Sequence, residues 1–159
     1  MAALYTNYAH IVVFLHVVSA FIWVGGMIAI RFAVHPTMQS IEEPKIKLGK
    51  TLALVGRFFH LVIPFILLIF ATGLIMAVAL QGHHGEQKAI FMVKESIWII
   101  MAANFTWMYL KRRKAQKLFE TEDLAGAKAV VALIPKLLLP INILLGIVAL
   151  WLGITLRGL

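Results

Sequence analysis

The stretch Tyr8-AHIVVFLHVVSAFIWVGGMIAI-Arg31 decides the fold of this chain. It carries no formal charge between its two ends, and about 20 apolar residues in a helix cross a hydrocarbon core of roughly 30 Å. The stretch therefore predicts a transmembrane helix. His10 and His16 lie inside it. Because lipid offers an imidazole no hydrogen-bond partner, such a group tends to face a bundle interior, where it is a common haem or metal ligand.

The composition of the whole chain also indicates a membrane protein. Of its 159 residues, 62% are hydrophobic and 14% are charged, whereas soluble domains contain about 45–50% apolar residues. A soluble domain of this length could not bury so much apolar surface. The chain has no cysteine, which excludes disulfides, thiolate ligation of haem and iron–sulfur clusters.

Four apolar segments predict an all-α, integral membrane bundle of four transmembrane helices. Their approximate ranges are 5–34, 52–80, 89–110 and 131–156. No connector between them is long enough for a soluble domain, so we expect residues 1–159 to form a single membrane domain.

Basic residues gather around the first and third connectors. They are Arg31, Lys45, Lys47, Lys50, Arg57, Lys111, Arg112, Arg113, Lys114, Lys117, Lys128 and Lys136, whereas Lys88, Lys94 and Arg157 lie toward the other side. By the positive-inside rule, both connectors are expected to be cytoplasmic, and both termini and the His83–His84 turn external. We therefore expect a multi-pass protein of the inner (cytoplasmic) membrane. The net charge of +8 then reflects topology, and no nucleic-acid partner is expected.

Helical periodicity predicts which face of the first helix points inward. His16, Ala20, Trp23 and Met27 share one stripe at 100° per residue. His10 lies about 120° away from His16 around the helix, so the two histidines do not present one face.

The remaining helices each have a predicted inward stripe. In chain order these are Ala53, Gly56, His60, Leu67 and Ala71; Lys94, Trp98, Met101 and Phe105; and Asn142, Gly146, Ala149 and Gly153. Small residues on one face let helices approach closely in lipid. The last helix is therefore expected to pack tightly, either against the bundle or against a second copy in a homodimer.

The antiparallel order of the helices predicts relative depths. His10 is expected level with Lys94, near the outer end, and His16 nearer mid-membrane, level with Met101. His60 is expected toward the cytoplasmic side, about nine residues or roughly 13 Å from the level of His16. One haem between these two histidines would need a different register.

These positions define a set of candidate ligands for haem b or a metal. His16 and His60 are the preferred iron or metal ligands, either with a partner still open or in two haem sites, an outer one with Lys94 or His10 and an inner one at His60. Basic residues near the cytoplasmic side could pair with haem propionates. The full candidate cofactor-binding set is His16, His60, His10, Lys94, Arg31, Arg57 and Trp23; no catalytic residue is assigned.

The stretch Leu15-HVVSAFIWVGG resembles the first helix of the HemJ-type membrane family of protoporphyrinogen oxidases and of the related CopD-type copper-resistance domain. In both, a histidine is followed by a tryptophan and small residues in a four-helix unit. Further likeness lies in Arg31-FAVH, Ala71-TGL, Val93-Lys94 and Pro140-INILLG. The resemblance to the HemJ-type family implies that His16 and Lys94 are associated with haem b and activity.

Three functions remain open at this point. The first is a haem b redox protein that transfers electrons or oxidises a small substrate such as a porphyrinogen or quinol. The second is a copper-handling protein of CopD type, in which His and Met side chains bind the metal. The third is a structural or assembly subunit. The lipid bilayer is a partner in all three, and a quinone or porphyrin is the expected substrate of the first.

Overall fold

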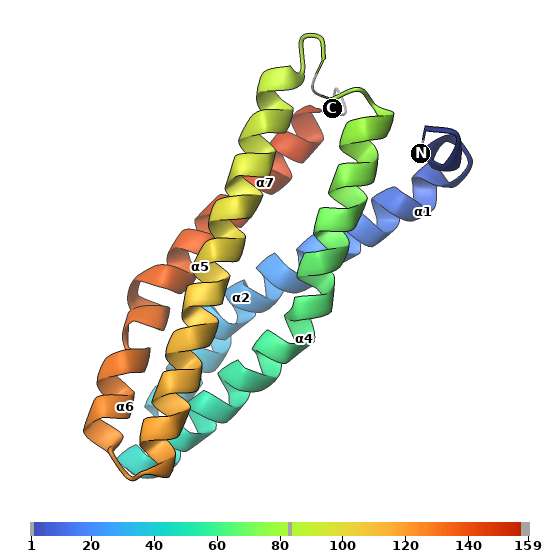
Figure 1. The fold of residues 1–159 in the computed structure, drawn as a ribbon. Helices are drawn as coiled ribbons and strands as arrows, with labels where there is room; N and C mark the ends of the chain where they lie inside the picture. The colour runs from blue at the N-terminus through green and yellow to red at the C-terminus, as the bar shows by residue number, and fades with distance from the viewer. Residues whose placement is uncertain (1, 83, 157–159) are drawn as a thin grey trace.

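The computed structural model describes residues 2–82 and 84–156, and within these residues every regular element is helical (Figure 1). Four continuous runs are long and apolar enough to cross a membrane, which confirms the predicted all-α bundle: Asn7–Gln39, Pro44–Ala79, Lys88–Glu120 and Leu124–Thr155. The elements, with η for π-helical segments, are α1 (Ala2–Ala20), η1 (Phe21–Gly25), α2 (Gly26–Ala29), η2 (Ile30–Val34), α3 (His35–Gln39), α4 (Pro44–Ala79), α5 (Lys88–Glu120), α6 (Leu124–Val131), η3 (Ile134–Leu138) and α7 (Leu139–Thr155).

The helices extend beyond the apolar segments that predicted them. The segment expected at 52–80 begins at Pro44, and the one expected at 89–110 continues to Glu120. Hydropathy reports only the part of a helix that is apolar, whereas the helix itself ends where backbone hydrogen bonding stops. Pro44 suits a helix start because its missing N–H would have no partner there.

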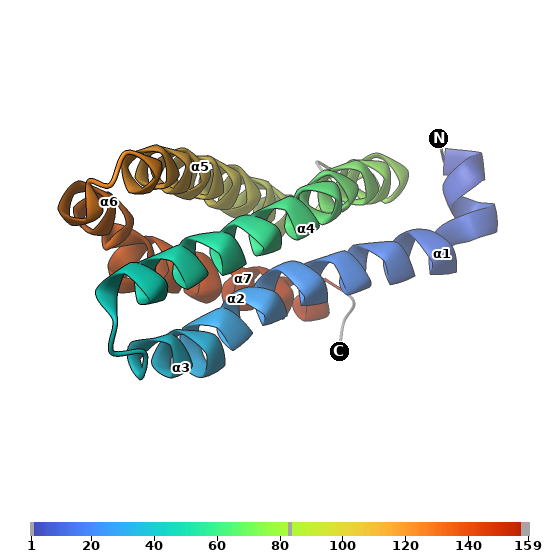
Figure 2. The ribbon, with the colours of Figure 1, turned by 90° about the horizontal axis from the view of Figure 1, so that it is seen from below.

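Bends in the long runs occur at identifiable residues. Tyr8 has non-helical dihedrals (φ −124°, ψ 20°), and the chain before it turns away from the rest of α1 (Figure 2). Pro64 lies inside α4. Because proline has no N–H, the carbonyl of His60 lacks the backbone hydrogen bond that it would otherwise accept. Figure 1 shows that α4 bends near its middle. In the same view, α1 and the half of α4 that begins at Pro44 run obliquely to α5.

The turn between α5 and α6 is held by hydrogen bonds at the ends of both helices. Glu122 is left-handed (φ 65°), and the N–H of Asp123 donates to the carbonyl of Leu118 at 2.9 Å, which closes the end of α5. The carboxylate of Asp123 then accepts from the N–H of Gly126 at 2.8 Å and begins α6. Lys45 forms an ion pair with Glu122 at 2.8 Å and lowers the pKa of that exposed carboxyl group.

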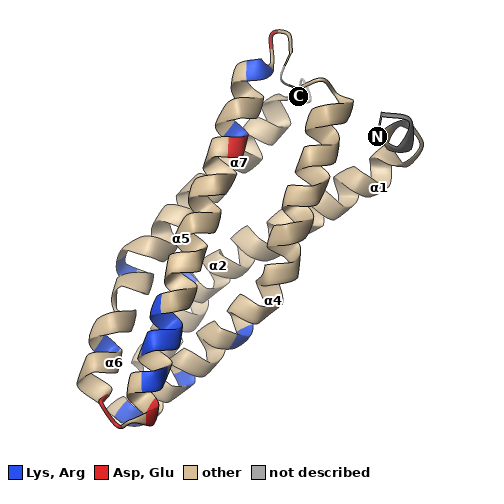
Figure 3. Cartoon of the chain, in the orientation of Figure 1, with Lys and Arg blue, Asp and Glu red and all other residues tan. Residues whose placement is uncertain are grey.

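Charge divides the bundle into two unlike ends. Lys and Arg gather where the chain passes from α3 to α4 and from α5 to α6 (Figure 3), and we call this the cationic end. The opposite end, which we call the loop end, holds the N-terminal part of α1, the α4–α5 loop and the last turn of α7. The predicted charge asymmetry is confirmed for the described residues; His83 and Arg157 lie outside them.

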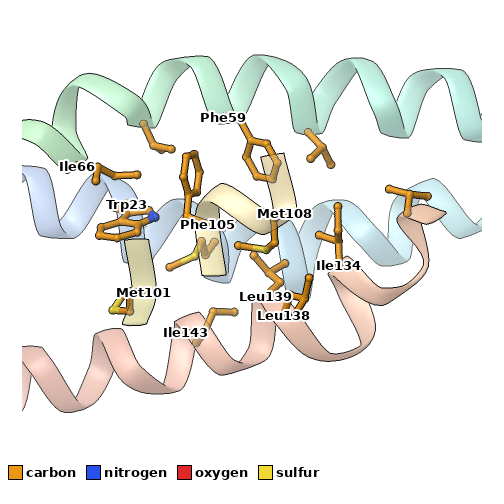
Figure 4. Close-up of a cluster of buried hydrophobic side chains, with 14 of the residues drawn as sticks. Trp23, Phe59, Ile66, Met101, Phe105, Met108, Ile134, Leu138, Leu139 and Ile143 are labelled. Carbon is orange, nitrogen blue, oxygen red and sulfur yellow. The ribbon is translucent and has the colours of Figure 1, made fainter. Parts of the chain in front are cut away.

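The apolar core lies where all four long runs meet. Figure 4 shows Trp23, Phe59 and Phe105 packed together with Met101 and Met108. The ring centroids of Phe59 and Phe105 are 5.0 Å apart, and those of Trp23 and Phe105 are 6.2 Å apart in an edge-to-face arrangement. The predicted inward faces of the first, third and fourth helices are thereby confirmed.

The inward face predicted for the second helix is wrong at four of its five positions, and only Gly56 is buried. His60 is exposed, and Leu67 is 63% exposed. The buried line of α4 is instead Leu52, Val55, Phe59, Val62, Ile66 and Ile69. Burying an aromatic ring removes much more apolar surface than burying an alanine or glycine, so the helix turns Phe59 inward. One residue corresponds to about 100° of rotation, and His60 therefore faces outward.

Two asparagines connect α5 to α7 across the apolar core. Asn142 is fully buried, and its carbonyl oxygen accepts from the amide of Asn104 at 2.7 Å. Asn104 also donates to the carbonyl of Leu138 at 2.8 Å, and Asn142 donates to the carbonyl of Met101 at 3.2 Å. Interhelical hydrogen bonds of this kind contribute roughly 0.6 kcal/mol each in membranes. They fix the register of α7 against α5.

A glycine allows α7 to approach the first helix closely. A Cβ placed on Gly146 would lie 2.6 Å from a methyl group of Val24 in η1, nearer than real Cβ contacts. The small-residue face of α7 is thus used inside the bundle, which answers the alternative that the sequence left open. The expected homodimer loses this support and stays a prediction.

We predict that Gly146→Ala lowers the free energy of unfolding by about 1–3 kcal/mol, because the added methyl group overpacks the contact with Val24. Gly25→Ala is the matched control, since a Cβ there meets its nearest neighbour, Phe21, at 3.9 Å. That control is expected to leave stability unchanged or to raise it by up to about 1 kcal/mol. Thermal unfolding of both variants in the same detergent measures the difference, and equal melting temperatures would contradict the close approach.

Candidate functional site

The side chain of His16 is anchored to α4 by hydrogen bonding. Its Nδ1 lies 2.9 Å from the hydroxyl oxygen of Thr72. That hydroxyl is also 2.6 Å from the carbonyl of Leu68, one turn earlier in α4, and it donates its only proton there. Thr72 can therefore only accept from His16, so Nδ1 carries the ring proton and Nε2 keeps its lone pair.

The ring of His16 also makes a hydrogen bond with the backbone carbonyl of Ile69 in the same part of α4. A carbonyl can only accept, so in the neutral ring the single proton on Nδ1 serves both contacts and Nε2 keeps its lone pair. A histidine whose Nδ1–H is held by a neighbour is the arrangement found for imidazole ligands of metals, because the held proton fixes both tautomer and ring orientation. The ring is only partly exposed and lies in the loop-end half of the bundle. The site can thus present one oriented, unprotonated nitrogen as a ligand inside the membrane span.

Lys94 of α5 lies beside His16, near enough for their charges to interact. Two glycines border this pair. A Cβ on Gly153 of α7 would lie 3.1 Å from the Lys94 ammonium nitrogen, and one on Gly73 of α4 would lie 3.6 Å from Cε1 of His16. Residues from four different helices therefore meet here, and the two glycines let the imidazole and the ammonium group pack closely against the backbones of α4 and α7.

Three buried polar groups near this pair have no hydrogen-bond partner among the described residues. They are the hydroxyl of Ser19 and the indole N–H groups of Trp23 and Trp98. The Trp23 nitrogen lies on the side of its ring that faces Phe105 (Figure 4), and an aromatic face is at best a weak acceptor. Leaving a buried donor unpaired costs about 1–3 kcal/mol each. Such groups in a folded protein call for an explanation.

The unpaired donors continue inward from His16 and Lys94. Helices α1 and α5 both run from the loop end toward the cationic end. Ser19 follows His16 by three residues and Trp98 follows Lys94 by four, so both lie about one turn deeper and at nearly the same depth. We call this set the polar column; it consists of His16, Ser19, Trp23, Thr72, Lys94 and Trp98.

The depth predicted for His16 is wrong. It was expected level with Met101, but it lies level with Lys94 and Gly153, and it is Val24 that lies beside Met101 and Gly146. The prediction counted residues from the helix ends as if all helices were parallel. Because α1 runs obliquely to α5, each of its residues advances less along the bundle axis, and His16 stays nearer the loop end.

The structure does not bring His60 or His10 to the polar column. His60 is exposed on the outer face of α4, with its ring 6.1 Å from that of Tyr109 in an edge-to-face arrangement. His10 is exposed too and lines a shallow open hollow on α1 together with Phe14. Neither imidazole faces the interior of the bundle, so the inner site expected at His60 is not formed there.

The predicted arginine contacts also lie elsewhere. Arg31 follows His16 by 15 positions in one helical run, which places it roughly 20 Å away toward the cationic end. Its guanidinium lies over the ring of Phe32 at 5.6 Å. Arg57 is exposed on α4 in the cationic half. Both arginines therefore mark the cationic end and are not part of the polar column.

Sequence reasoning missed Thr72, Ser19 and the indole of Trp98 as members of the site. Each is a hydrogen-bonding side chain inside an apolar span, and that is the signal that could have selected them. Thr72 in particular carries the orientation of His16, yet it stands 56 positions away in the chain. Only the packing of α1 on α4 joins the two.

A multidentate metal site is not formed by the described residues: no three His, Asp or Glu side chains lie near enough to hold one ion. A haem iron needs fewer ligating side chains, because it takes only one or two protein ligands.

Comparison with known proteins gives one partial match. No family model matches the chain, and no solved structure matches it. A curated protein of Aquifex aeolicus (strain VF5), which bears the name Uncharacterized protein, is 37% identical over 75 residues; the match covers 43% of this chain and 48% of that protein. The chain thus spans about half the length of the curated relative that it matches, and this likeness assigns no activity.

We predict that Thr72→Val changes the proton distribution of His16. With no hydroxyl to accept from Nδ1–H, the ring is expected to populate both tautomers, and its two ¹⁵N resonances to move toward each other. NMR of ¹⁵N-histidine-labelled protein measures this. Thr51→Val is the control, because Thr51 also donates to the carbonyl one turn back, that of Lys47, but contacts no histidine. Unchanged His16 resonances in Thr72→Val would contradict the proposed orientation.

Proposed function

We propose that this chain is a haem b-binding membrane redox protein in which Nε2 of His16 ligates the iron. The observation that carries the proposal is the hydrogen bond from His16 Nδ1–H to Thr72, which leaves Nε2 oriented and unprotonated inside the bundle. An imidazole in a membrane span is expensive unless it has a task. The resemblance of the first helix to the HemJ-type family supports the same assignment.

The surroundings of His16 fit a haem in two further respects. Gly73 and Gly153 border the imidazole and the Lys94 ammonium group without side chains of their own, so a cofactor there would meet only backbone on those two sides. Lys94 supplies either a second nitrogen ligand or a positive charge for a propionate. Of the two partners that the sequence offered for His16, the structure favours Lys94, since His10 faces outward.

A bound haem b would supply one-electron redox chemistry, and the protein residues bind and insulate it. Thr72 orients the ligand, and buried aromatic side chains such as Trp23 and Phe105 exclude water on the cationic side of the site. Low polarity and restricted solvent access around such a group tune its reduction potential. The reaction served would be electron transfer or oxidation of a small substrate, such as a porphyrinogen or quinol.

We further propose an orientation in the inner (cytoplasmic) membrane, with the cationic end in the cytoplasm and both termini outside. The charge distribution between the two ends supports it. Copper handling of CopD type and a structural or assembly role are the alternatives. Either would appear as a protein that is purified without a haem spectrum, with copper present in the first case.

We predict that the purified protein shows a Soret band that shifts on reduction with dithionite, and that His16→Ala abolishes it or reduces haem content at least tenfold. His60→Ala is the matched control: it also removes an imidazole, but one that is exposed on the outer face of α4. Haem content by the pyridine haemochrome assay, normalised to protein, compares the two. A colourless wild-type protein made with ample haem, or a His16→Ala variant with unchanged haem content and spectrum, would refute the assignment.

We also predict that Thr72→Val weakens haem binding by about 10–100-fold, the usual cost of losing the group that orients a ligating histidine. Haem titration of apoprotein gives the dissociation constant, with Thr51→Val as the control. Because Thr72 does not touch the iron in this proposal, the position of the Soret band should be retained at saturating haem. A variant that binds as tightly as the wild type would show that Thr72 does not position His16.

A further inference from the structure

We infer that the polar column also binds the headgroup of a quinone, with Ser19 and Trp98 donating hydrogen bonds to its carbonyl oxygen. The inference deepens the proposed function by naming the substrate class at the same site, and it rests on that function for its redox role. The binding event itself does not require haem, so the two can be tested separately.

Ser19 and Trp98 are buried hydrogen-bond donors without a partner among the described residues. Ser19 is 1% exposed, and its hydroxyl makes no hydrogen bond to the preceding turn, unlike those of Thr72, Ser96 and Thr106, which donate to backbone carbonyls within their own helices. The indole N–H of Trp98 is equally buried and unpaired. These two donors stand at nearly the same depth on α1 and α5.

The donors define the chemistry of the group that they would bind. The column presents the Ser19 hydroxyl, the indole N–H of Trp98 and the ammonium of Lys94, and an indole or an ammonium group can only donate. The complement is a group with acceptor oxygens and no protons of its own. A quinone carbonyl has this character. A porphyrinogen, whose pyrrole nitrogens all carry hydrogen, would set donors against donors here.

Trp98 lies close to the lipid-facing surface of the bundle. The ring of Phe70 stacks on Trp98 with centroids 4.7 Å apart and 28° between the planes. Phe70 is 49% exposed on the outer surface of α4. Trp98 therefore lies just inside a side chain that contacts lipid, and lipid is where a quinone with an apolar tail is dissolved. A flat aromatic headgroup could also stack on the indole in place of the Phe70 ring.

The test measures binding of a soluble quinone, decylubiquinone, to the full chain in detergent by isothermal titration calorimetry. Ser19→Ala and Trp98→Phe are each expected to weaken binding roughly tenfold, because each removes one hydrogen bond to a buried acceptor. Ser96→Ala and Trp107→Phe are the controls, since both side chains are exposed on α5. The controls are expected to bind like the wild type.

The titration is run on haem-free and on haem-loaded protein so that its failure can be separated from that of the proposed function. Quinone binding that depends on Ser19 and Trp98 in haem-free protein supports the inference even if haem content shows the haem assignment to be wrong. Absence of binding in a protein that holds haem through His16 overturns the inference and leaves the haem assignment intact. Equal affinities of Ser19→Ala, Trp98→Phe and their controls also overturn it, and would assign the unpaired donors to buried water.

Because Ser19→Ala and Trp98→Phe could loosen the bundle, their melting temperatures in detergent are compared with those of the controls. The reduced form, decylubiquinol, gives a second readout that a structural defect would not produce. Its hydroxyl groups bring protons that the indole of Trp98 and the ammonium group of Lys94 cannot accept, and in the haem-loaded protein the lone pair of His16 Nε2 is taken by iron. The haem-loaded wild type is therefore expected to bind the quinol less tightly than the quinone. Loss of this preference in Ser19→Ala and Trp98→Phe is the expected signature, and a wild type without any preference contradicts the inference.

Discussion

Hydrocarbon offers no hydrogen-bond partner, and the whole arrangement of this bundle depends on that constraint. Each polar side chain inside a span must find its partner on another helix or in its own backbone. The bond between His16 and Thr72 satisfies an imidazole in this way, and it ties α1 to α4 in the loop-end half. The asparagine pair Asn104 and Asn142 does the same for α5 and α7 nearer the middle. Polar contacts therefore set the register of an otherwise apolar bundle.

The same constraint gives meaning to the groups that are not satisfied. The fully buried Asn142 has its hydrogen bonds satisfied. The hydroxyl of Ser19 and the indole N–H of Trp98, by contrast, have no partners among the described residues. These donors lie near His16, whose Nδ1 is held by Thr72. Oriented lone pair, ammonium group and unpaired donors thus occupy about two turns of the same interior, and a redox cofactor with a quinone substrate would use all of them.

Packing explains why only some of the candidate site residues face the interior of the bundle. Large aromatic side chains take the interior positions of α4, which turns Phe59 inward and His60 outward. Close approach at Gly146 brings α7 against η1 and completes the enclosure of Trp23. The cationic end is built from helix extensions beyond the apolar spans, and Arg31 and Arg57 lie in that half. Distance along the bundle axis therefore separates the arginines from His16.

The sequence by itself determined the fold class, the four spans, the charge asymmetry of the two ends and the inward faces of three helices. These follow from hydropathy, periodicity and charge, which are local properties that lipid converts directly into structure. Only the tertiary structure decided the depth of His16 beside Lys94, the outward position of His60, and the partnership of His16 with Thr72. Helix tilt and the competition of side chains for interior space settle those features, and both arise only when residues distant in the chain pack together.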